Sequence, residues 1–265
     1  KLLFEINDRK NNQTPLMHAV HKKDLVQIKE ILDKNVKILT GIEDKDKYID
    51  INTQTCDFNY TALLFAIDGE DLSIINELLN APEIDVNLAD ISGATPLMHA
   101  AYVGNIKVFN ALLGCSAVNI NTQNKFGGTA LSLACSSGHV DIVKTLLGCD
   151  GIKVNPLTSD GLEILENDEE MYKIAINALD IDSLKTSHVS ERNSCLHFAI
   201  HEEHEEIAKL LLERDDIKVN IRNGNGDTAL AYAAFQNNFD ILKLLLAKSN
   251  VNVNTINPQG YTPVL

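Results

Sequence analysis

Short runs of small and apolar residues recur along this chain, and each begins directly after a threonine or serine. The clearest run covers residues 95–101, Thr-Pro-Leu-Met-His-Ala-Ala. A threonine can cap the first turn of a helix, and proline fits the next position, where no amide donor is needed. The pattern therefore predicts a short helix after each of these residues, which we call the anchors. The other anchors are Thr14, Thr61, Thr129, Ser194, Thr228 and Thr262, where the run is cut short.

A second helix is predicted in each period. Gly104 and Gly138 lie nine residues after their anchors and indicate a helix break, a place that Asn237 takes in a later period. The apolar pattern then resumes and ends in a Leu-Leu or Ile-Leu pair, 17 and 18 residues after the anchor. A Val-Asn or Ile-Asn step follows, and then a polar turn. The pairs stand at residues 31–32, 78–79, 112–113, 146–147, 211–212 and 245–246.

Most successive anchors are 34 residues apart. A two-helix unit of this length cannot bury its apolar face alone, so a fixed period predicts stacked units that cover one another. Helix, break, helix and turn, with Thr-Pro-Leu and Val-Asn signatures, resemble the ankyrin repeat. The resemblance spans essentially the whole chain. It implies an all-α solenoid, a stack of helix-turn-helix units with β-hairpin-like fingers.

We therefore predict one domain over residues 1–265 with about eight units, anchored near 14, 61, 95, 129, 163, 194, 228 and 262. The fifth unit is degenerate. It lacks the Thr-Pro-Leu signature, but Asn155 and Gly161 precede residue 163 by the offsets that Asn121 and Gly127 have from Thr129. A weak unit can act as a hinge in such a stack. The eighth unit is truncated, and the chain starts without Met, so we expect a piece of a larger protein.

Thirteen extra residues separate the first two anchors beyond the usual period. We predict an inserted loop over residues 33–50, since polar insertions between packed units usually run over the surface.

The resemblance implies a concave face that binds another protein, built from finger tips and from the ends of the first helices. Aromatic side chains fall at several of these positions, and exposed aromatic residues are typical interface anchors. The alternative is that each ring lies flat on a neighbouring finger. The candidate partner-binding residues are Phe58, Tyr60, Ile91, Tyr102, Lys125, Phe126, His201, Glu202, Asp227, Phe235 and Tyr261.

The chain is acidic, with a formal net charge of −14. This argues against nucleic acid as a partner, because phosphate contacts require clustered Lys and Arg. Residues 150–216 hold 17 acidic and 6 basic side chains, including 166–170 and 202–206. This region could attract a basic segment of a partner, or could simply be a solvated face. No apolar run is long enough to span a membrane. We expect a monomer.

Motifs for chemistry are few. His197, His201 and His204 have helical spacing, but a helix break separates the last from the others, and the repeat pattern explains each of them. Residues 44–46 do not continue as a calcium loop, since Ile49 and Thr55 stand where Gly and Glu are needed. We expect no metal, no cofactor and no catalytic site. His18 and His99 share one offset and are expected to bond adjacent loops.

The five cysteines show no disulfide or metal pattern, which predicts reduced thiols, most of them buried, in a cytoplasmic setting. The sequence thus predicts a non-catalytic protein-binding module, and one expected setting is an effector that an intracellular bacterium secretes into a host cytosol. One alternative is a substrate-selecting region of a larger enzyme. The other is a structural spacer.

Overall fold

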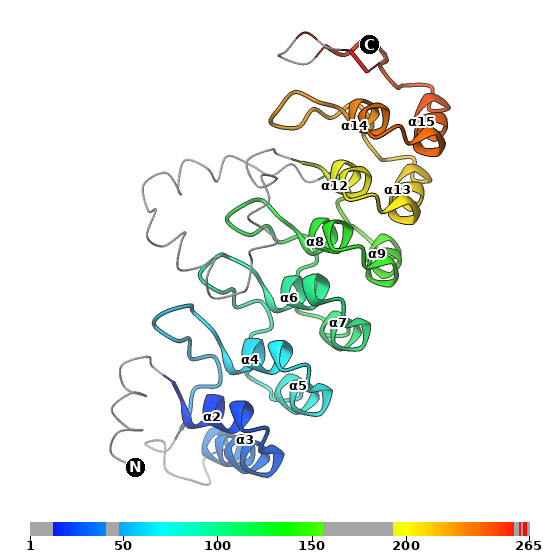
Figure 1. The fold of residues 1–265 in the computed structure, drawn as a ribbon. Helices are drawn as coiled ribbons and strands as arrows, with labels where there is room; N and C mark the ends of the chain where they lie inside the picture. Colours follow the sequence, from blue (N-terminus) through cyan, green and yellow to red (C-terminus); the bar gives the residue numbers. More distant parts are fainter. Residues whose placement is uncertain (1–12, 41–47, 156–192, 257–259, 261, 264–265) are drawn as a thin grey trace. The chain divides into compact units, whose positions relative to one another are not determined.

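A computed structural model describes residues 13–40, 48–155 and 193–256, together with 260, 262 and 263 (Figure 1). The chain divides into two compact units, Lys1–Asn119 and Ile120–Leu265. Each unit is a set of helix pairs without a named strand in its described part, as the all-α prediction requires. No described helix has the length and apolar character that crossing a membrane demands.

The described part of the first unit contains three helix pairs. First helices pack on first helices and second helices on second helices, so that α4 contacts both α2 and α6, and α5 contacts both α3 and α7. This is the layered packing predicted from the period. The helices are α2 (Pro15–His21), α3 (Leu25–Leu39), α4 (Ala62–Asp68), α5 (Leu72–Leu79), α6 (Pro96–Val103) and α7 (Ile106–Leu113).

The second unit repeats this arrangement in its described part. Helix α12 contacts both α8 and α14, and α13 contacts both α9 and α15. The helices are α8 (Ala130–Ser136), α9 (Val140–Leu147), α12 (Cys195–His201), α13 (Glu205–Leu212), α14 (Ala229–Phe235) and α15 (Phe239–Leu246).

Each described anchor from Thr14 to Thr228 caps a first helix, as predicted. In each case the anchor's side-chain oxygen accepts a hydrogen bond from the backbone N–H three residues later. The breaks also stand where the sequence places them. Gly104 and Gly138 have φ of 85° and 77°, and Asn237 has φ of 56°. This left-handed conformation costs glycine little and asparagine less than most residues, which explains the residue choice.

The leucine pairs form the core between second helices. Leu78, Leu112, Leu146, Leu211 and Leu245 are each 0% exposed. The second member of most pairs is only half-buried. One apolar face of each short helix is thus removed from water by its neighbours, and burial of a leucine side chain contributes about 2 kcal/mol.

The asparagine of each Val-Asn step bonds the loop of the next repeat. Asn87 donates from Nδ2 to the carbonyl of Ala117 at 2.8 Å and accepts from the N–H of Asn119 at 3.0 Å. Asn121 makes the same two bonds to Gly151 and Lys153, at 2.9 and 2.8 Å. The signature is therefore a two-bond bridge between successive loops.

Asn155 makes the same two-bond bridge to a more distant segment of the chain. Asn155 donates to the carbonyl of Asp216 at 2.8 Å and accepts from the N–H of Lys218 at 2.9 Å. Helices α8 and α9 contact α12 and α13 directly. These contacts place α12 and α13 next to α8 and α9 in the stack. The predicted anchor at 163 lies outside the described residues.

The expected loop over residues 33–50 is wrong in its first part. Helix α3 runs on to Leu39, because Ile28, Ile31, Asn35 and Ile38 continue one buried face at helical spacing without glycine or proline. Buried Asn35 then holds the chain beyond the helix: its Nδ2 donates to the carbonyl of Ile49 at 2.6 Å, and its Oδ1 accepts from the N–H of Ile49 at 3.2 Å. Residues 41–47 lie outside the described part.

Fewer cysteines are buried than the sequence suggests. Cys135 and Cys195 are buried, Cys56 is exposed, and Cys115 and Cys149 are half-buried. The last two follow the glycines that end α7 and α9, where the packed face of the helix has already stopped.

We predict that residues 156–192 can be replaced without loss of the stack. A variant that joins Asn155 to Asn193 through Thr-Gln-Asn-Lys-Phe-Gly, the finger sequence at residues 122–127, should keep its helical circular dichroism. Its free energy of unfolding in urea should stay equal or rise by about 1–2 kcal/mol, because the connection is shorter. A loss of several kcal/mol would show that the replaced residues contribute a packed repeat.

Candidate binding surface

The fingers of the first unit have a rigid tip. Asp90 Oδ1 accepts hydrogen bonds from the N–H of Ser92 at 2.8 Å and from the N–H of Ala94 at 2.9 Å. The N–H of Ile91 donates to the carbonyl of Phe58 at 2.8 Å, which ties this tip to the preceding one. The two predicted contact residues Phe58 and Ile91 therefore stand side by side at successive tips, and both are half-exposed.

Tyr60 is not a surface residue, which corrects the prediction. Its ring is 7% exposed. The ring centroid lies 5.1 Å from that of Phe65 and 5.7 Å from that of His99, with the second contact edge-on. Burial raises the pKa of the Tyr60 hydroxyl above its usual range. The negative charge of Asp68 and the hydrogen bond to it raise this pKa further. Tyr60 therefore packs between repeats, as the alternative reading of these aromatic residues held.

His99 bridges two repeats by charge, as its expected role of bonding adjacent loops requires. Its Nε2 lies 3.0 Å from Asp90 Oδ2, and its Nδ1 lies 3.4 Å from Asp68 Oδ1. Burial alone would lower the pKa of His99, but the hydrogen bonds and charges of the two carboxylates outweigh it and raise the pKa to about 9. At neutral pH a buried imidazolium thus links the end of α4 to the next finger.

The pKa of Asp90 moves in the opposite direction. Burial would raise this pKa, but the hydrogen bond to His99 and its charge lower it. Hydrogen bonds from Ser92 and Ala94 lower it further. The Asp90–His99 pair is therefore ionised across the neutral range. Tyr102, the other candidate of this unit, is half-exposed near the end of α6, beside Val103, which is 40% exposed.

Asparagine takes the place of Asp90 in the second unit. Asn124 Oδ1 accepts from the N–H of Phe126 at 3.0 Å and of Gly128 at 2.7 Å, and Asn223 does the same for Asn225 and Asp227. These tip-forming residues were missed in the sequence, although each stands five residues before its anchor. At the first of these tips Lys125 is exposed and Phe126 is half-exposed.

The structure brings His201 and Glu202 together at the end of α12. Nδ1 of His201 lies 3.2 Å from Oε1 of Glu202, and the His201 ring lies 5.3 Å from the ring of Tyr232, edge-on. Tyr232 was not selected from the sequence. It stands four residues after its anchor, the offset of His99, and this shared offset could have identified it. Its hydroxyl accepts from Asn223 Nδ2 at 3.1 Å.

The histidines at helical spacing have separate protein contacts. His197 Nδ1 lies 2.8 Å from Ser194 Oγ, and its Nε2 lies 3.1 Å from the carbonyl of Asp227. His204 Nε2 lies 3.0 Å from the carbonyl of Ser136. In the described part of the chain, no three His, Cys, Asp or Glu side chains are placed to hold a metal ion.

Phe235 is 86% exposed at the end of α14. Residues seven after an anchor pack on residues four after the next anchor, as the His21–Phe65 rings at 4.4 Å and the His201–Tyr232 rings show. Phe235 stands at the first of these two positions, seven residues after Thr228. Its part in partner binding stays a prediction.

The acidic residues around α13 are partly paired. Glu206 forms an ion pair with Lys144 of α9 at 2.8 Å, and Glu205 pairs with Lys209 one turn along the helix. The first pair links two repeats and the second lies within α13, and the carboxylates of both stay partly solvated. The predicted acidic stretch at 166–170 and the candidate Tyr261 lie outside the described residues.

We predict that stability falls at high pH through His99. The folded pKa of about 9 exceeds the ordinary 6.5, so the stabilisation is complete below pH 6.5 and is lost as the pH rises through about 9. The difference in unfolding free energy between the parent protein and His99→Gln should shrink by about 2–3 kcal/mol from pH 6 to pH 10. Urea titrations at both values measure it. A constant difference would contradict a charged His99.

We also predict that replacing Tyr60 destabilises the protein more than replacing Phe58. Tyr60→Ala should lower the free energy of unfolding by about 3 kcal/mol, because it empties a buried site. Phe58→Ala should cost less than about 1 kcal/mol, because its ring is half-exposed. Denaturation curves of the two variants make a matched comparison, and equal losses would place both rings in the core.

Comparison with known families agrees with this geometry. The model of ankyrin repeats (3 copies) matches residues 34–124, 69–158 and 161–257. No curated protein matches the chain.

Solved structures show the same fold. The ankyrin repeat domain of Bcl-3, a member of the IkappaB protein family, is similar with a TM-score of 0.64 and 20% identity, over 96% of this chain and 93% of that one. An ankyrin repeat domain from Acinetobacter baumannii has a TM-score of 0.64 and 24% identity, over 88% and 96%. A complex of a predatory endopeptidase and an immunity protein from Bdellovibrio bacteriovorus contains a similar chain, with a TM-score of 0.57 and 24% identity over 76% and 88%.

Together with the family match over most of its length, the capped helix pairs and fingers show that this chain belongs to the ankyrin-repeat family.

Proposed function

We propose that this protein binds a partner protein through its finger tips and the exposed ends of its first helices. Ankyrin repeats are generally protein–protein interaction modules and are typically non-catalytic. The observation that supports this surface is the pair Phe58 and Ile91. Two apolar side chains stand side by side on tips held by backbone hydrogen bonds, and both keep part of their surface in water.

Internal packing does not account for this pair as it does for Tyr60. Tyr60, two residues after Phe58, packs its ring against Phe65 and His99. Phe58 keeps part of its surface in water, and exposed aromatic residues on a rigid frame are typical interface hot spots. A preformed surface also binds at a lower entropic cost than one that must become ordered.

In the second unit we propose Lys125 and Phe126 at the finger tip, together with His201, Glu202 and Asp227, as the contact residues. The formal net charge of −14 favours a partner with a basic segment, since complementary charge speeds encounter and orients docking. One similar structure is a complex of an endopeptidase with an immunity protein, which supports protein binding by this fold. We further propose that the protein acts as a monomer in the cytoplasm.

We also propose two roles that this binding surface could serve within a larger protein. The chain serves either as the recognition part of an effector or as the substrate-selecting region of a larger enzyme. Either setting uses the same surface, so the binding test below applies to both.

We predict that Phe58→Ala combined with Ile91→Ala weakens partner binding more than about tenfold, which is about 1.4 kcal/mol or more. The partner is first captured from a eukaryotic cytosolic lysate, identified by mass spectrometry and purified. Isothermal titration calorimetry then gives Kd for the parent and for the variant. The loss is expected because two apolar anchors leave the interface while the fingers remain.

A matched control is Val26→Ala on α3. Val26 is 69% exposed and apolar but belongs to a second helix, away from the fingers. Its removal should leave Kd unchanged. Unchanged binding by the finger variant, with circular dichroism showing intact helices, would contradict the proposed surface.

A further inference from the structure

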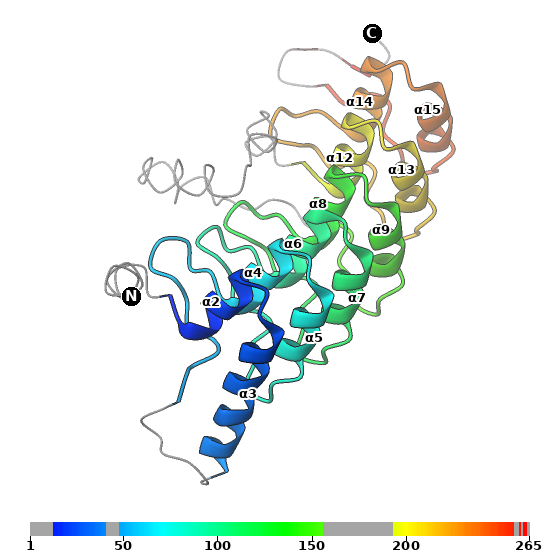
Figure 2. The ribbon, with the colours of Figure 1, turned by 60° about the horizontal axis from the view of Figure 1, so that its bottom comes forward.

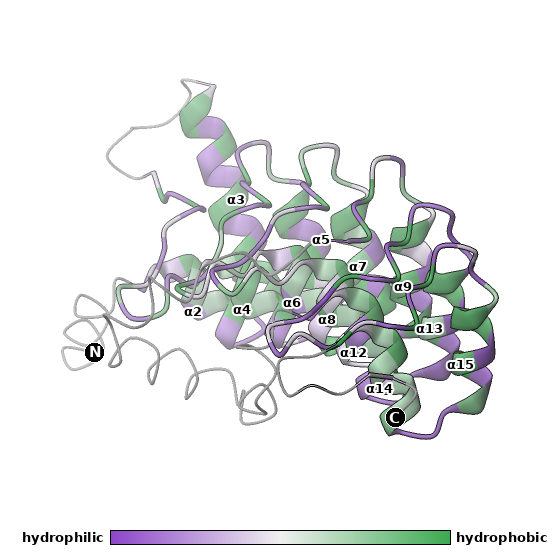
Figure 3. Ribbon diagram, turned by 90° about the horizontal axis from the view of Figure 1, so that it is seen from above, coloured by the Kyte–Doolittle hydropathy of each residue, from purple (hydrophilic) through white to green (hydrophobic). Residues whose placement is uncertain are grey.

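Helix α3 is longer than the second helices beside it. It has 15 residues, whereas α5 and α7 have 8 each. Its last two turns extend beyond the end of α5, as Figures 2 and 3 show. No second helix of the next repeat is available to cover this extension. The apolar residues on that side are therefore covered by something other than the regular stack, or stay open to solvent.

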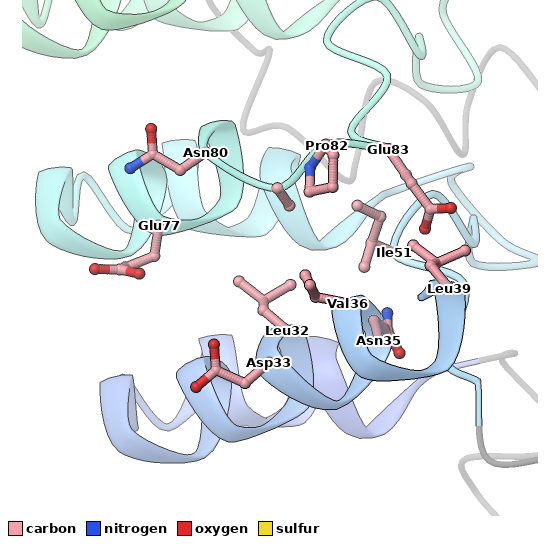
Figure 4. A pocket seen from close by; sticks show the side chains of 11 residues that line it. Leu32, Asp33, Asn35, Val36, Leu39, Ile51, Glu77, Asn80, Pro82 and Glu83 are labelled. Atoms are coloured by element: carbon pink, nitrogen blue, oxygen red, sulfur yellow. The ribbon is translucent and has the colours of Figure 1, made fainter. Parts of the chain in front are cut away.

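A cleft of about 170 Å³ lies between this extension and the segment that follows α5 (Figure 4). Leu32, Val36 and Leu39 line it from α3, one helical turn apart. Ile51 and Pro82 line it from the following repeat. Val36 is 43% exposed and Leu39 is 50% exposed, so the apolar wall faces water.

The size of the cleft limits its occupant. Small-molecule and cofactor sites usually measure about 300–1,000 Å³. An apolar cavity of about 150 Å³ holds one benzene molecule. The cleft therefore fits one large apolar side chain, such as that of phenylalanine or leucine, rather than a cofactor.

The charged residues of the lining are all carboxylates: Asp33, Glu77 and Glu83. Glu77 forms an ion pair with Lys29 at 2.9 Å, and Glu83 accepts a hydrogen bond from the hydroxyl of Tyr48. Asp33 has no ion-pair partner within the described residues. The neighbouring lysines of α3 do not line the cleft. An occupant with a cation next to its apolar side chain would thus complement both parts of the wall.

We propose that this cleft docks a segment of a partner protein in which a large apolar side chain stands next to lysine or arginine. The apolar side chain enters between Val36 and Pro82, and the cation pairs with Asp33. This second surface lies on the second-helix side of the first unit. It is separate from the finger tips and does not depend on the function proposed for them.

Three labelled peptides test the proposal by fluorescence anisotropy at low salt. One carries Lys-Phe-Lys within a Gly-Ser sequence, the second Glu-Phe-Glu, and the third Lys-Ala-Lys. The first should bind, and each of the others should bind at least about tenfold more weakly, because charge and apolar burial both contribute. Equal binding of the first and third peptides would reveal only general attraction to an acidic protein and would overturn the proposal.

Paired variants locate the site. Val36→Asn should weaken binding of the Lys-Phe-Lys peptide about tenfold, whereas Val26→Asn, on the same helix but outside the cleft, should not. Asp33→Asn should weaken binding, whereas Glu30→Gln should not. Circular dichroism checks that all four variants fold. Equal effects within either pair would overturn the site.

The chain's own residues 41–47 are the other possible occupant, and Ile42 is their only large apolar residue. Binding of the Lys-Phe-Lys peptide to Ile42→Ser but not to the parent protein would assign the cleft to this segment and overturn the proposal. Absence of binding to either protein would also overturn it. Binding to both, with the expected pattern of variants, would support it.

Discussion

The order of the repeats depends on two hydrogen bonds that the asparagine at the end of a repeat makes to the next loop. Leucine packing between second helices is strong but not directional, so it tolerates sliding of one helix on another. One asparagine side chain that both donates to a carbonyl and accepts from an N–H two residues later fixes two neighbouring loops at one distance and in one register. Asn155 shows its importance. It makes the usual pair of bonds even though its partners, Asp216 and Lys218, lie more than sixty residues further along the chain.

This explains which parts of the fold could be predicted. Caps, breaks and leucine pairs depend on residues within one repeat, so Thr95, Gly104 and Leu112 have the expected roles. Which repeat follows which depends on a distant segment. Asn155 stands at the same offset in its repeat whether its partner comes 30 or 61 residues later, so its presence did not require a repeat anchored at 163. The extension of α3 could have been foreseen from its continued helical period.

The candidate surface was harder to predict because neighbouring positions of the same residue class have different environments. Phe58 and Tyr60 flank Asn59, whose φ of 56° turns the chain, and Phe58 is half-exposed whereas Tyr60 is buried. Only the partners of Tyr60, namely Phe65 and His99, decide that it is the buried one. Asp90 could have been found, since an Asp or Asn that accepts from the N–H two residues later is typical of such turns.

The same contact between repeats is built from different chemistry along the chain. The residue seven after one anchor meets the residue four after the next: as two rings for His21 and Phe65, as an ion pair for Asp68 and His99, and as two rings for His201 and Tyr232. Only the second of these contacts depends on the protonation of His99, whose pKa is about 9. A stack of repeats loses stability one interface at a time, since each repeat contacts only its neighbours. Alkaline pH should therefore weaken the interface behind Phe58 and Ile91 first, while the ring contact of the second unit persists.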